Sequence, residues 1–163
     1  MLKTERLLLR AARHTDLDDL FAIFHDPRAM RYWSTPPHDT PDRTQENLDR
    51  MIASAKDRLV YFVIEHQGRV IGTAGMHRGD EVGFILHPNH WRQGIVTEAM
   101  TAIIPHLFAT TDVKQLTADA DPHNLASINC LKSLGFHVTS RAKNTFCING
   151  VWSDSLYFAL PRP

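Results

Sequence analysis

The sequence has few cysteines, no excess of either charge and no long apolar run. Only Cys130 and Cys147 are present among 163 residues, too few for a disulfide framework, which favours a reducing compartment. Basic and acidic side chains number 18 each, so no overall charge attracts nucleic acid or an anionic membrane. No stretch has the length of a membrane-spanning helix, and no signal-peptide pattern opens the chain. We therefore expect a cytoplasmic protein without a nucleic-acid or membrane partner.

The sequence also lacks metal and nucleotide motifs. Its ten histidines are scattered, and the closest pair, His87 and His90, has no cysteine or carboxylate cluster nearby to complete a site. We therefore expect no metal. Neither the G-x-x-x-x-G-K-[ST] pattern of P-loops nor G-x-G-x-x-G occurs, which argues against a nucleotide phosphate-binding domain of those classes.

What is present is a continuous alternation of helix and strand patterns. No repeat or long linker divides the chain, so we expect a single α+β domain over residues 1–163. Hydrophobic periodicity and turn residues predict a mixed sheet with helices on its faces. The predicted elements are a strand at 4–12, helices from 15 to 26 and from 40, strands at 59–65, 70–76 and 81–86, a helix from 95, a strand at 115–120, a helix from 124 to 135, and strands at 136–141 and 151–160.

Local signals refine three of these elements. Pro105 should kink the helix that begins near 95, because proline removes one backbone hydrogen bond. Asn124 should cap the following helix and Gly135 should end it. Asn149-Gly150 predicts a tight turn between the last two strands. The residues expected to pack inward from the helix after Asn124 are Leu125, Ile128, Leu131 and Leu134.

The segment from Trp91 to Ala99 joins a predicted strand to a predicted helix. Gly94 allows a ligand to approach the backbone closely. The first turn of the helix offers unpaired N–H groups and the positive end of the helix dipole. Together these features suit a pyrophosphate, although an ordinary strand-to-helix turn explains them equally well.

A second segment, Asp121 to Ser127, leads into the next helix. The side chain of Asn124 can cap that helix, or it can bind an amide of an extended ligand lying across the strand ends. Both roles are compatible if its oxygen and its nitrogen serve different partners.

Taken together, these segments resemble the GNAT superfamily of N-acetyltransferases, and more narrowly its Rim-type ribosomal-protein N-acetyltransferases. The resemblance covers nearly the whole chain in the right order and spacing. It is carried by Thr4-Glu5-Arg6-Leu7-Leu8-Leu9-Arg10, Gly83-Phe84-Ile85-Leu86, the loop Trp91 to Ala99, Asn124-x-x-Ser127 followed by Leu134-Gly135-Phe136, and Asn149-Gly150-x-Trp152-x-Asp154.

The resemblance implies a GNAT fold with a mostly antiparallel sheet, and acetyl-CoA bound in a cleft between two splayed parallel strands. Backbone groups of β-strand residues would pair with the pantetheine arm, and loop N–H groups would hold the pyrophosphate. The implied cofactor-binding residues are Phe84, Ile85, Leu86, Arg92, Gln93, Gly94, Ile95, Val96, Thr97, Asn124, Ser127 and Asn129. Val96 is a departure, because the family usually has glycine or alanine there, and the larger side chain brings bulk close to the phosphates.

The resemblance also suggests how the reaction is catalysed. Acetyl transfer needs a deprotonated amine, a polarised thioester carbonyl and a protonated leaving thiolate. The family often has a glutamate where Glu81 stands, so Glu81 is the candidate base, although it could instead be a solvated strand end or hold a neighbouring loop. Many relatives place a tyrosine acid at the position of Leu131, and this chain therefore lacks the usual proton donor. Ser127 is the nearest hydroxyl, and Cys130 is expected to be inert packing.

The acceptor end of the site should come from the N-terminal helices. Tyr32 and Trp33 form an aromatic pair in the loop that borders the acceptor entrance in the family, although local core packing would also explain them. The acceptor is expected to be a protein or peptide N-terminal amine or a small primary amine, and the protein a monomer or homodimer. The alternative is a catalytically weak acyl-CoA-binding regulatory domain, for which Leu131 and Val96 would be the support.

Overall fold

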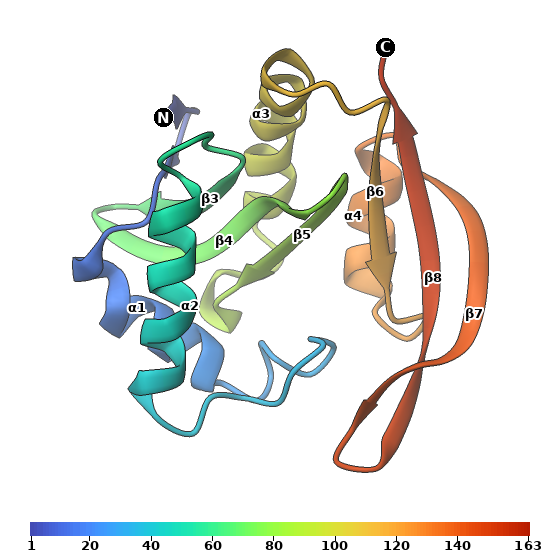
Figure 1. Cartoon of the computed structure of the whole chain (residues 1–163), viewed down its shortest axis with the longest axis horizontal. Helices are drawn as coiled ribbons and strands as arrows, with labels where there is room; N and C mark the ends of the chain where they lie inside the picture. Colours follow the sequence, from blue (N-terminus) through green and yellow to red (C-terminus); the bar gives the residue numbers. More distant parts are fainter.

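The computed structural model describes residues 1–163 and contains one eight-stranded sheet in the order β1-β2-β3-β4-β5-β6-β8-β7 (Figure 1). All neighbouring strands are antiparallel except β5 and β6, which are parallel. The predicted order of helices and strands is confirmed, with a short additional strand at the N-terminus. The strands are β1 (Leu2–Lys3), β2 (Leu8–Arg10), β3 (Tyr61–His66), β4 (Arg69–Arg78), β5 (Glu81–Leu86), β6 (Gln115–Ala120), β7 (His137–Ile148) and β8 (Val151–Pro161).

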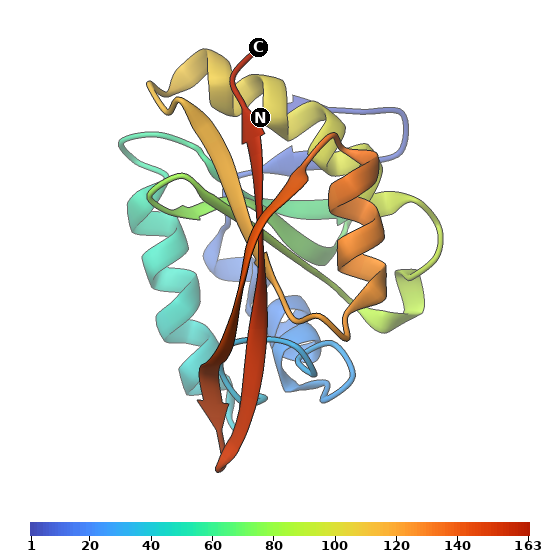
Figure 2. The same ribbon diagram turned by 90° about the vertical axis from the view of Figure 1, so that its right-hand side faces the viewer.

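Helices cover both faces of the sheet, and Figure 2 shows α2 and α4 on opposite sides of it. The helices are α1 (Leu17–His25), α2 (Pro41–Ser54), α3 (Ile95–Thr110) and α4 (Leu125–Ser133), with single 3₁₀ turns η1 (His14–Asp16) and η2 (Pro88–His90). Side chains along β3 point alternately to the two faces of the sheet, and each face has its own core. Phe62 and Ile64 enter the larger core beneath α3 and α4, whereas Val63 enters the smaller core beneath α1 and α2.

Two local predictions are wrong. Residues 4–7 do not continue the first strand, because the Thr4 hydroxyl oxygen accepts a hydrogen bond from the Leu7 N–H at 3.0 Å and closes a turn. Leu125 does not pack inward; it is 66% exposed, because α4 begins at this residue and its first turn lies at the mouth of a cleft. Ile128 and Leu131 are buried as predicted.

Other local signals are confirmed. Thr40 and Pro41 begin α2, with Pro41 at the first helical position. Asn149 and Gly150 both have positive φ, +51° and +80°, as a tight hairpin turn requires. Helix α3 continues through Pro105 as far as Thr110, and the kink expected at Pro105 stays a prediction.

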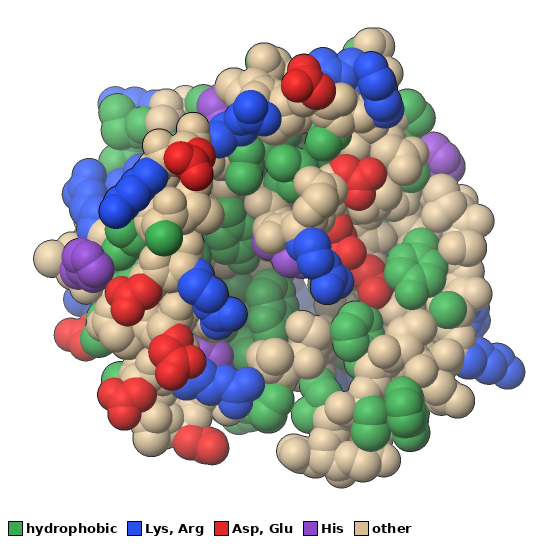
Figure 3. All heavy atoms as spheres, viewed as in Figure 1, with side chains coloured by type: hydrophobic (Ala, Val, Ile, Leu, Met, Phe, Trp, Pro, Cys, Tyr) green, Lys and Arg blue, Asp and Glu red, His purple; other side chains and the backbone are tan.

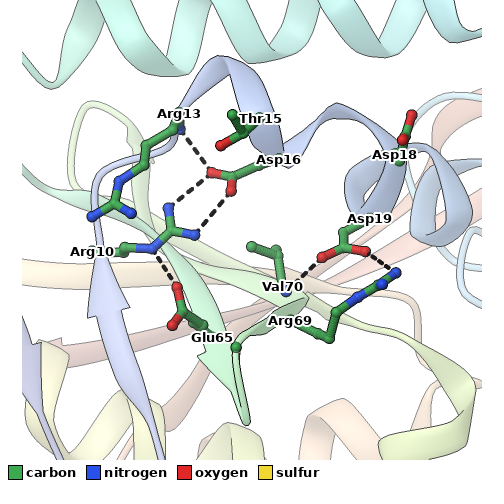
Figure 4. Close-up of a pocket in the computed structure, with 10 residues that line it drawn as sticks. Arg10, Arg13, Thr15, Asp16, Asp18, Asp19, Glu65, Arg69 and Val70 are labelled. Carbon is green, nitrogen blue, oxygen red and sulfur yellow. Dashed lines mark hydrogen bonds and ion pairs between the residues drawn. The ribbon is translucent and has the colours of Figure 1, made fainter.

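A buried ion-pair network fixes the N-terminal strand to the sheet and to η1 (Figure 4). Both Arg10 amino groups donate to the Asp16 carboxylate at 2.9 Å, and the Arg10 Nε donates to Glu65 at 2.6 Å. The Arg13 N–H adds a third hydrogen bond to Asp16 at 2.7 Å. These groups line a polar hollow of about 460 Å³, but they satisfy one another, so we assign the network a structural role.

Candidate functional site

The parallel strands β5 and β6 separate almost at once. They are paired only at Glu81 and Thr117, near the beginning of each strand. Beyond this point they diverge, and a cleft of about 830 Å³ opens between them, visible as the hollow at the centre of the face in Figure 3. Its walls come from β5, β6, the beginning of α3, α4 and the loop between α1 and α2.

One wall of the cleft is a free strand edge. The N–H of His87 donates to the carbonyl oxygen of Ile71 on β4 at 2.8 Å. Backbone N–H and C=O groups alternate in direction along a strand. The backbone groups of Ile85 therefore also face β4, whereas those of Phe84 and Leu86 point into the cleft. The Trp91 indole N–H donates to the Leu86 carbonyl oxygen at 2.9 Å, which is consistent with this direction.

The N-terminus of α3 forms the second wall. Gly94 precedes the helix with a φ of +71°, a conformation that glycine adopts at little cost. The first bond of the helix is donated by the Glu98 N–H to the Gly94 carbonyl oxygen, so the N–H groups of Ile95 to Thr97 have no helical partner. These free donors and the helix dipole make an anion site.

An ion pair holds this loop in place. The Arg6 Nε donates to the Glu98 carboxylate at 2.7 Å, and an Arg6 amino group donates to the Gln93 carbonyl oxygen at 3.0 Å. Burial opposes ionisation of Glu98, but hydrogen bonds from Thr4 and Arg6 hold its pKa below the usual value. The turn at residues 4–7 therefore supports the anion site from outside.

Within the loop, the predicted residues occupy different positions. Arg92 lines the cleft with a φ of +60°, which is strained for a residue with a side chain. Val96 also lines the cleft, and it is half-buried against the larger core. Gln93 does not line the cleft, because its side chain turns back to the Asn89 carbonyl oxygen.

Helix α4 provides the third wall. The Asn124 side-chain oxygen accepts from the Ser127 N–H at 3.2 Å, so the predicted cap is confirmed and the amide nitrogen remains free. Asn124, Ser127 and Asn129 all line the cleft. Cys130 lines it as well, 3.7 Å from the Thr97 hydroxyl oxygen, and burial raises the pKa of its thiol, which disfavours a reactive thiolate.

The aromatic pair lies at the other end of the cleft. Tyr32 and Trp33 both line it. The Tyr32 hydroxyl donates to the His123 carbonyl oxygen at 3.4 Å and so connects the α1–α2 loop to the turn before α4. Trp33 also packs beside Phe24, with ring centroids 6.4 Å apart. Trp33 therefore lines the cleft and also packs locally, while the acceptor role of the pair stays a prediction.

The structure brings carboxylates from β6 and the turn after it to the cleft, but not the carboxylate of β5. Glu81, the predicted base, is not among the lining residues; its carboxylate lies 3.2 Å from His77 Nε2. Asp119 and Asp121 do line the cleft. Burial raises the pKa of Asp119, a hydrogen bond from Ser155 lowers it, and the charges of Glu81 and Asp121 raise it further, with a net increase.

Sequence reasoning missed Asp119, although a signal was available. The side chains of Leu116, Ala118 and Ala120 are buried on one face of β6, so Asp119 must point to the opposite face. Aspartate is depleted in strands, and its presence within a partly buried strand indicates a special role.

Two further features limit the chemistry of the site. Leu131 is buried in the cleft wall at 2% exposure, and it has no proton to donate. No group of three or more histidine, cysteine, aspartate or glutamate side chains is arranged to hold a metal ion.

No helix is long and apolar enough to cross a membrane.

The chain is similar to known acetyltransferases along almost its whole length. Residues 6–137 match the family described as the acetyltransferase (GNAT) domain. The uncharacterized N-acetyltransferase p20 of Bacillus licheniformis is 29% identical over 98% of this chain and 94% of its own length. The [ribosomal protein uS5]-alanine N-acetyltransferase of Escherichia coli is 32% identical over 50% of this chain and 42% of its own.

Solved structures share the fold. A GNAT-family acetyltransferase from Bacillus anthracis superposes with a TM-score of 0.87 at 21% identity, covering 98% of this chain and 97% of its own. The spermidine N-acetyltransferase of Vibrio cholerae, solved with CoA and spermine, gives a TM-score of 0.81 at 21% identity, covering 97% and 96%.

Proposed function

Because the chain belongs to the GNAT acetyltransferase family, and is thus an acetyl-CoA-dependent N-acetyltransferase, we propose that this cleft binds the cofactor. The acceptor in this proposal is the N-terminal α-amine of a peptide or protein, or a small primary amine. The observation that supports this most directly is the early divergence of β5 and β6 beside the uncapped N-terminus of α3. The alternative of a regulatory acyl-CoA-binding domain is not favoured, because relatives along the full chain are named N-acetyltransferases.

The residues of the cleft fit acetyl-CoA in two respects. The free edge at Phe84 and Leu86 suits the amides of a pantetheine arm, and the N–H groups of Ile95, Val96 and Thr97 suit a pyrophosphate. Arg92 adds a positive charge, although its guanidinium is exposed. Asn124, Ser127 and Asn129 would line the arm from α4, while Ile85 would contribute its side chain and Gln93 only its backbone.

Acetyl-CoA supplies an activated acyl group as a thioester, and the chain supplies the proton transfer and orientation. An ammonium cannot attack, so a carboxylate must first accept its proton. Glu81 remains our sequence-based candidate, and Asp119 is a second because it faces the cleft. Backbone N–H groups of β5 would polarise the carbonyl. With Leu131 in place of an acid, we propose that the departing sulfur takes its proton from water.

The acceptor class is suggested by the open end of the cleft. Tyr32 and Trp33 would border the acceptor entrance, and Asp119 and Asp121 would attract a cationic amine. One relative acetylates a ribosomal-protein alanine and one structural neighbour is a spermidine N-acetyltransferase. We therefore expect peptide α-amines first and polyamines second.

Other properties follow from the same proposal. We treat residues 1–163 as a single N-acetyltransferase domain that needs no metal, acting as a monomer or homodimer. The two cysteines are free thiols, which fits a reducing cytoplasm.

The function is tested by measuring thiol release from acetyl-CoA with a panel of N-terminal peptides, amino acids, polyamines and aminoglycosides. We expect turnover with at least one class. If no member of the panel causes thiol release while calorimetry confirms acetyl-CoA binding, the proposed enzymatic activity is contradicted and a binding domain is favoured.

The base is tested by comparing Glu81→Gln with Asp119→Asn at a saturating acetyl-CoA concentration. The variant that removes the base should lower kcat by at least about 100-fold, in the range for general bases, while acetyl-CoA affinity is retained. Asp80→Asn is a matched control, because Asp80 accepts from Thr117 outside the cleft. Unchanged turnover in Glu81→Gln would remove Glu81 from the mechanism.

A further inference from the structure

The β7–β8 hairpin reaches the cleft through one buried hydroxyl group. Ser155, on β8, is completely buried, and its Oγ donates to Asp119 Oδ2 at 2.9 Å. The other carboxylate oxygen, Oδ1, makes no hydrogen bond within the chain, and Asp119 lines the cleft. Oδ2 of the carboxylate is therefore hydrogen-bonded to the hairpin, while Oδ1 is available to a ligand.

A second hydroxyl supports the first. Thr145 Oγ1 lies 2.7 Å from Ser155 Oγ and 3.2 Å from the Ser153 carbonyl oxygen. If the Ser155 proton is directed to Asp119, the Ser155 oxygen can accept from Thr145. Thr145 has a single proton, which it can donate either to Ser155 or to the Ser153 carbonyl oxygen. When it donates to Ser155, the two hydroxyls form a short chain that ends at the carboxylate.

An irregularity in β7 brings Thr145 next to Ser155. The register of β7 against β8 shifts between Ala142 and Phe146, and Asn144 has a φ of +52°. The Asp154 carboxylate accepts from the Asn144 N–H at 3.0 Å and from an Arg141 amino group at 3.4 Å, which fixes the bulge. Bulges of this kind re-aim side chains next to active sites.

We propose that the hairpin is a working part of the active site, in which Ser155, supported by Thr145 and by the bulge anchored at Asp154, positions Asp119 to receive the acceptor ammonium. Ser155 is a positioning residue, because it acts through Asp119 and does not touch the substrate. This assignment rests on the proposed acetyl transfer and deepens it, because it names the carboxylate that receives the amine and the elements that orient it.

The chemistry at Asp119 is a proton transfer. One proton of the bound ammonium moves to Asp119 Oδ1 and then to solvent, which leaves a lone pair on nitrogen. The nitrogen forms a bond to the acetyl carbon as the carbon–sulfur bond breaks, and a second nitrogen proton is released as water protonates the sulfur. The products are the amide, free CoA and one proton.

Several charged groups act on Asp119 from the elements around it. Glu81 on β5 and Asp121 at the end of β6 both raise its pKa, after burial as the largest cause, whereas the hydrogen bond from Ser155 lowers it. His77 and Arg78 on β4 face Glu81 rather than Asp119. Removing the Ser155 donor should therefore raise the pKa of Asp119, so that the base becomes protonated at a higher pH.

The test is the pH dependence of kcat for Ser155→Ala, which reports groups in the enzyme–substrate complex. We expect the acidic limb to move to higher pH and kcat to fall by roughly tenfold, because a misplaced carboxylate loses orientation. The acetyl-CoA KM should not change. Ser153→Ala is the matched control, two residues away on β8, because its hydroxyl makes no hydrogen bond to another residue.

Thr145→Val provides a second variant in case Ser155→Ala folds poorly. It keeps the volume of the side chain and should move the limb in the same direction by a smaller amount. If the acidic limb of the kcat profile coincides with that of the wild type in both variants, the proposal is overturned, even where a variant has a lower melting temperature. An inactive wild type would instead contradict the proposed function, so the two failures are distinguishable.

Discussion

At the scale of single residues, the chain keeps two charged groups buried only where they are fully paired. Arg10 and Asp16 are 6% and 4% exposed, and each has at least two hydrogen-bond partners. Removing one member of such a pair leaves an uncompensated buried charge, which costs more than the pair contributes. The same logic explains why Asp119, with only one partner, has a raised pKa.

We predict that Asp16→Asn lowers the free energy of unfolding at pH 7 by about 3 kcal/mol, the scale found for broken buried pairs. Burial opposes ionisation of Asp16, but hydrogen bonds from Arg10 and Arg13 bring its pKa below the ordinary 3.8. A lowered folded-state pKa gives stability that is present above the unfolded-state value and is lost as pH falls through the folded one.

The difference between the wild type and Asp16→Asn should therefore shrink below about pH 4. Urea denaturation at pH 7 and pH 3 measures it, with the exposed Asp18→Asn as the control. An equal difference at both pH values would show that lost packing, rather than the charge, explains the effect.

At the scale of elements, α4 begins with a side chain that has two separable functions. The oxygen of Asn124 caps the helix, and the nitrogen of the same amide is free at the cleft. Aspartate keeps a capping oxygen and suits the positive end of the helix, but it cannot donate a hydrogen bond to a ligand carbonyl.

We therefore predict that Asn124→Asp leaves the melting temperature unchanged and weakens acetyl-CoA binding roughly tenfold, the scale of one lost hydrogen bond. Asn124→Ala should weaken binding and also cost about 1 kcal/mol of stability through the lost cap. Calorimetry and thermal unfolding of both variants measure the two effects. Normal binding by Asn124→Asp would restrict Asn124 to the capping role.

The elements themselves were largely predictable, because their signals are local. Gly135 ends α4, and Asn149-Gly150 turns the hairpin, through backbone conformations that depend on neighbouring residues only. The contacts of Asp119 were not predictable, because Ser155 lies 36 positions away and reaches it only after β8 has paired with β6. The position of Glu81 outside the cleft lining likewise depends on where two distant strands separate.

At the scale of the whole molecule, the sheet is weakest where the site is built. The strands from β1 to β5 are linked to those from β6 to β8 through a single register pair, Glu81 with Thr117, and by the helices on its faces. A ligand that pairs with β5 and also contacts α4 would join the two halves. Its binding should therefore stabilise the molecule as a unit rather than one element alone.

We predict that acetyl-CoA at 100 times its Kd stabilises the protein by about 2.7 kcal/mol, as binding to the folded state alone requires, and raises the melting temperature by about 5–10 °C. Amide hydrogen exchange should slow at Phe84, Leu86 and residues 95–97, whose N–H groups face the cleft. Two fragments separate the contributions: pantetheine should protect the strand edge, and ADP the beginning of α3. Protection that appears in neither place would mean that the cofactor binds elsewhere, and the cleft would lose its assignment.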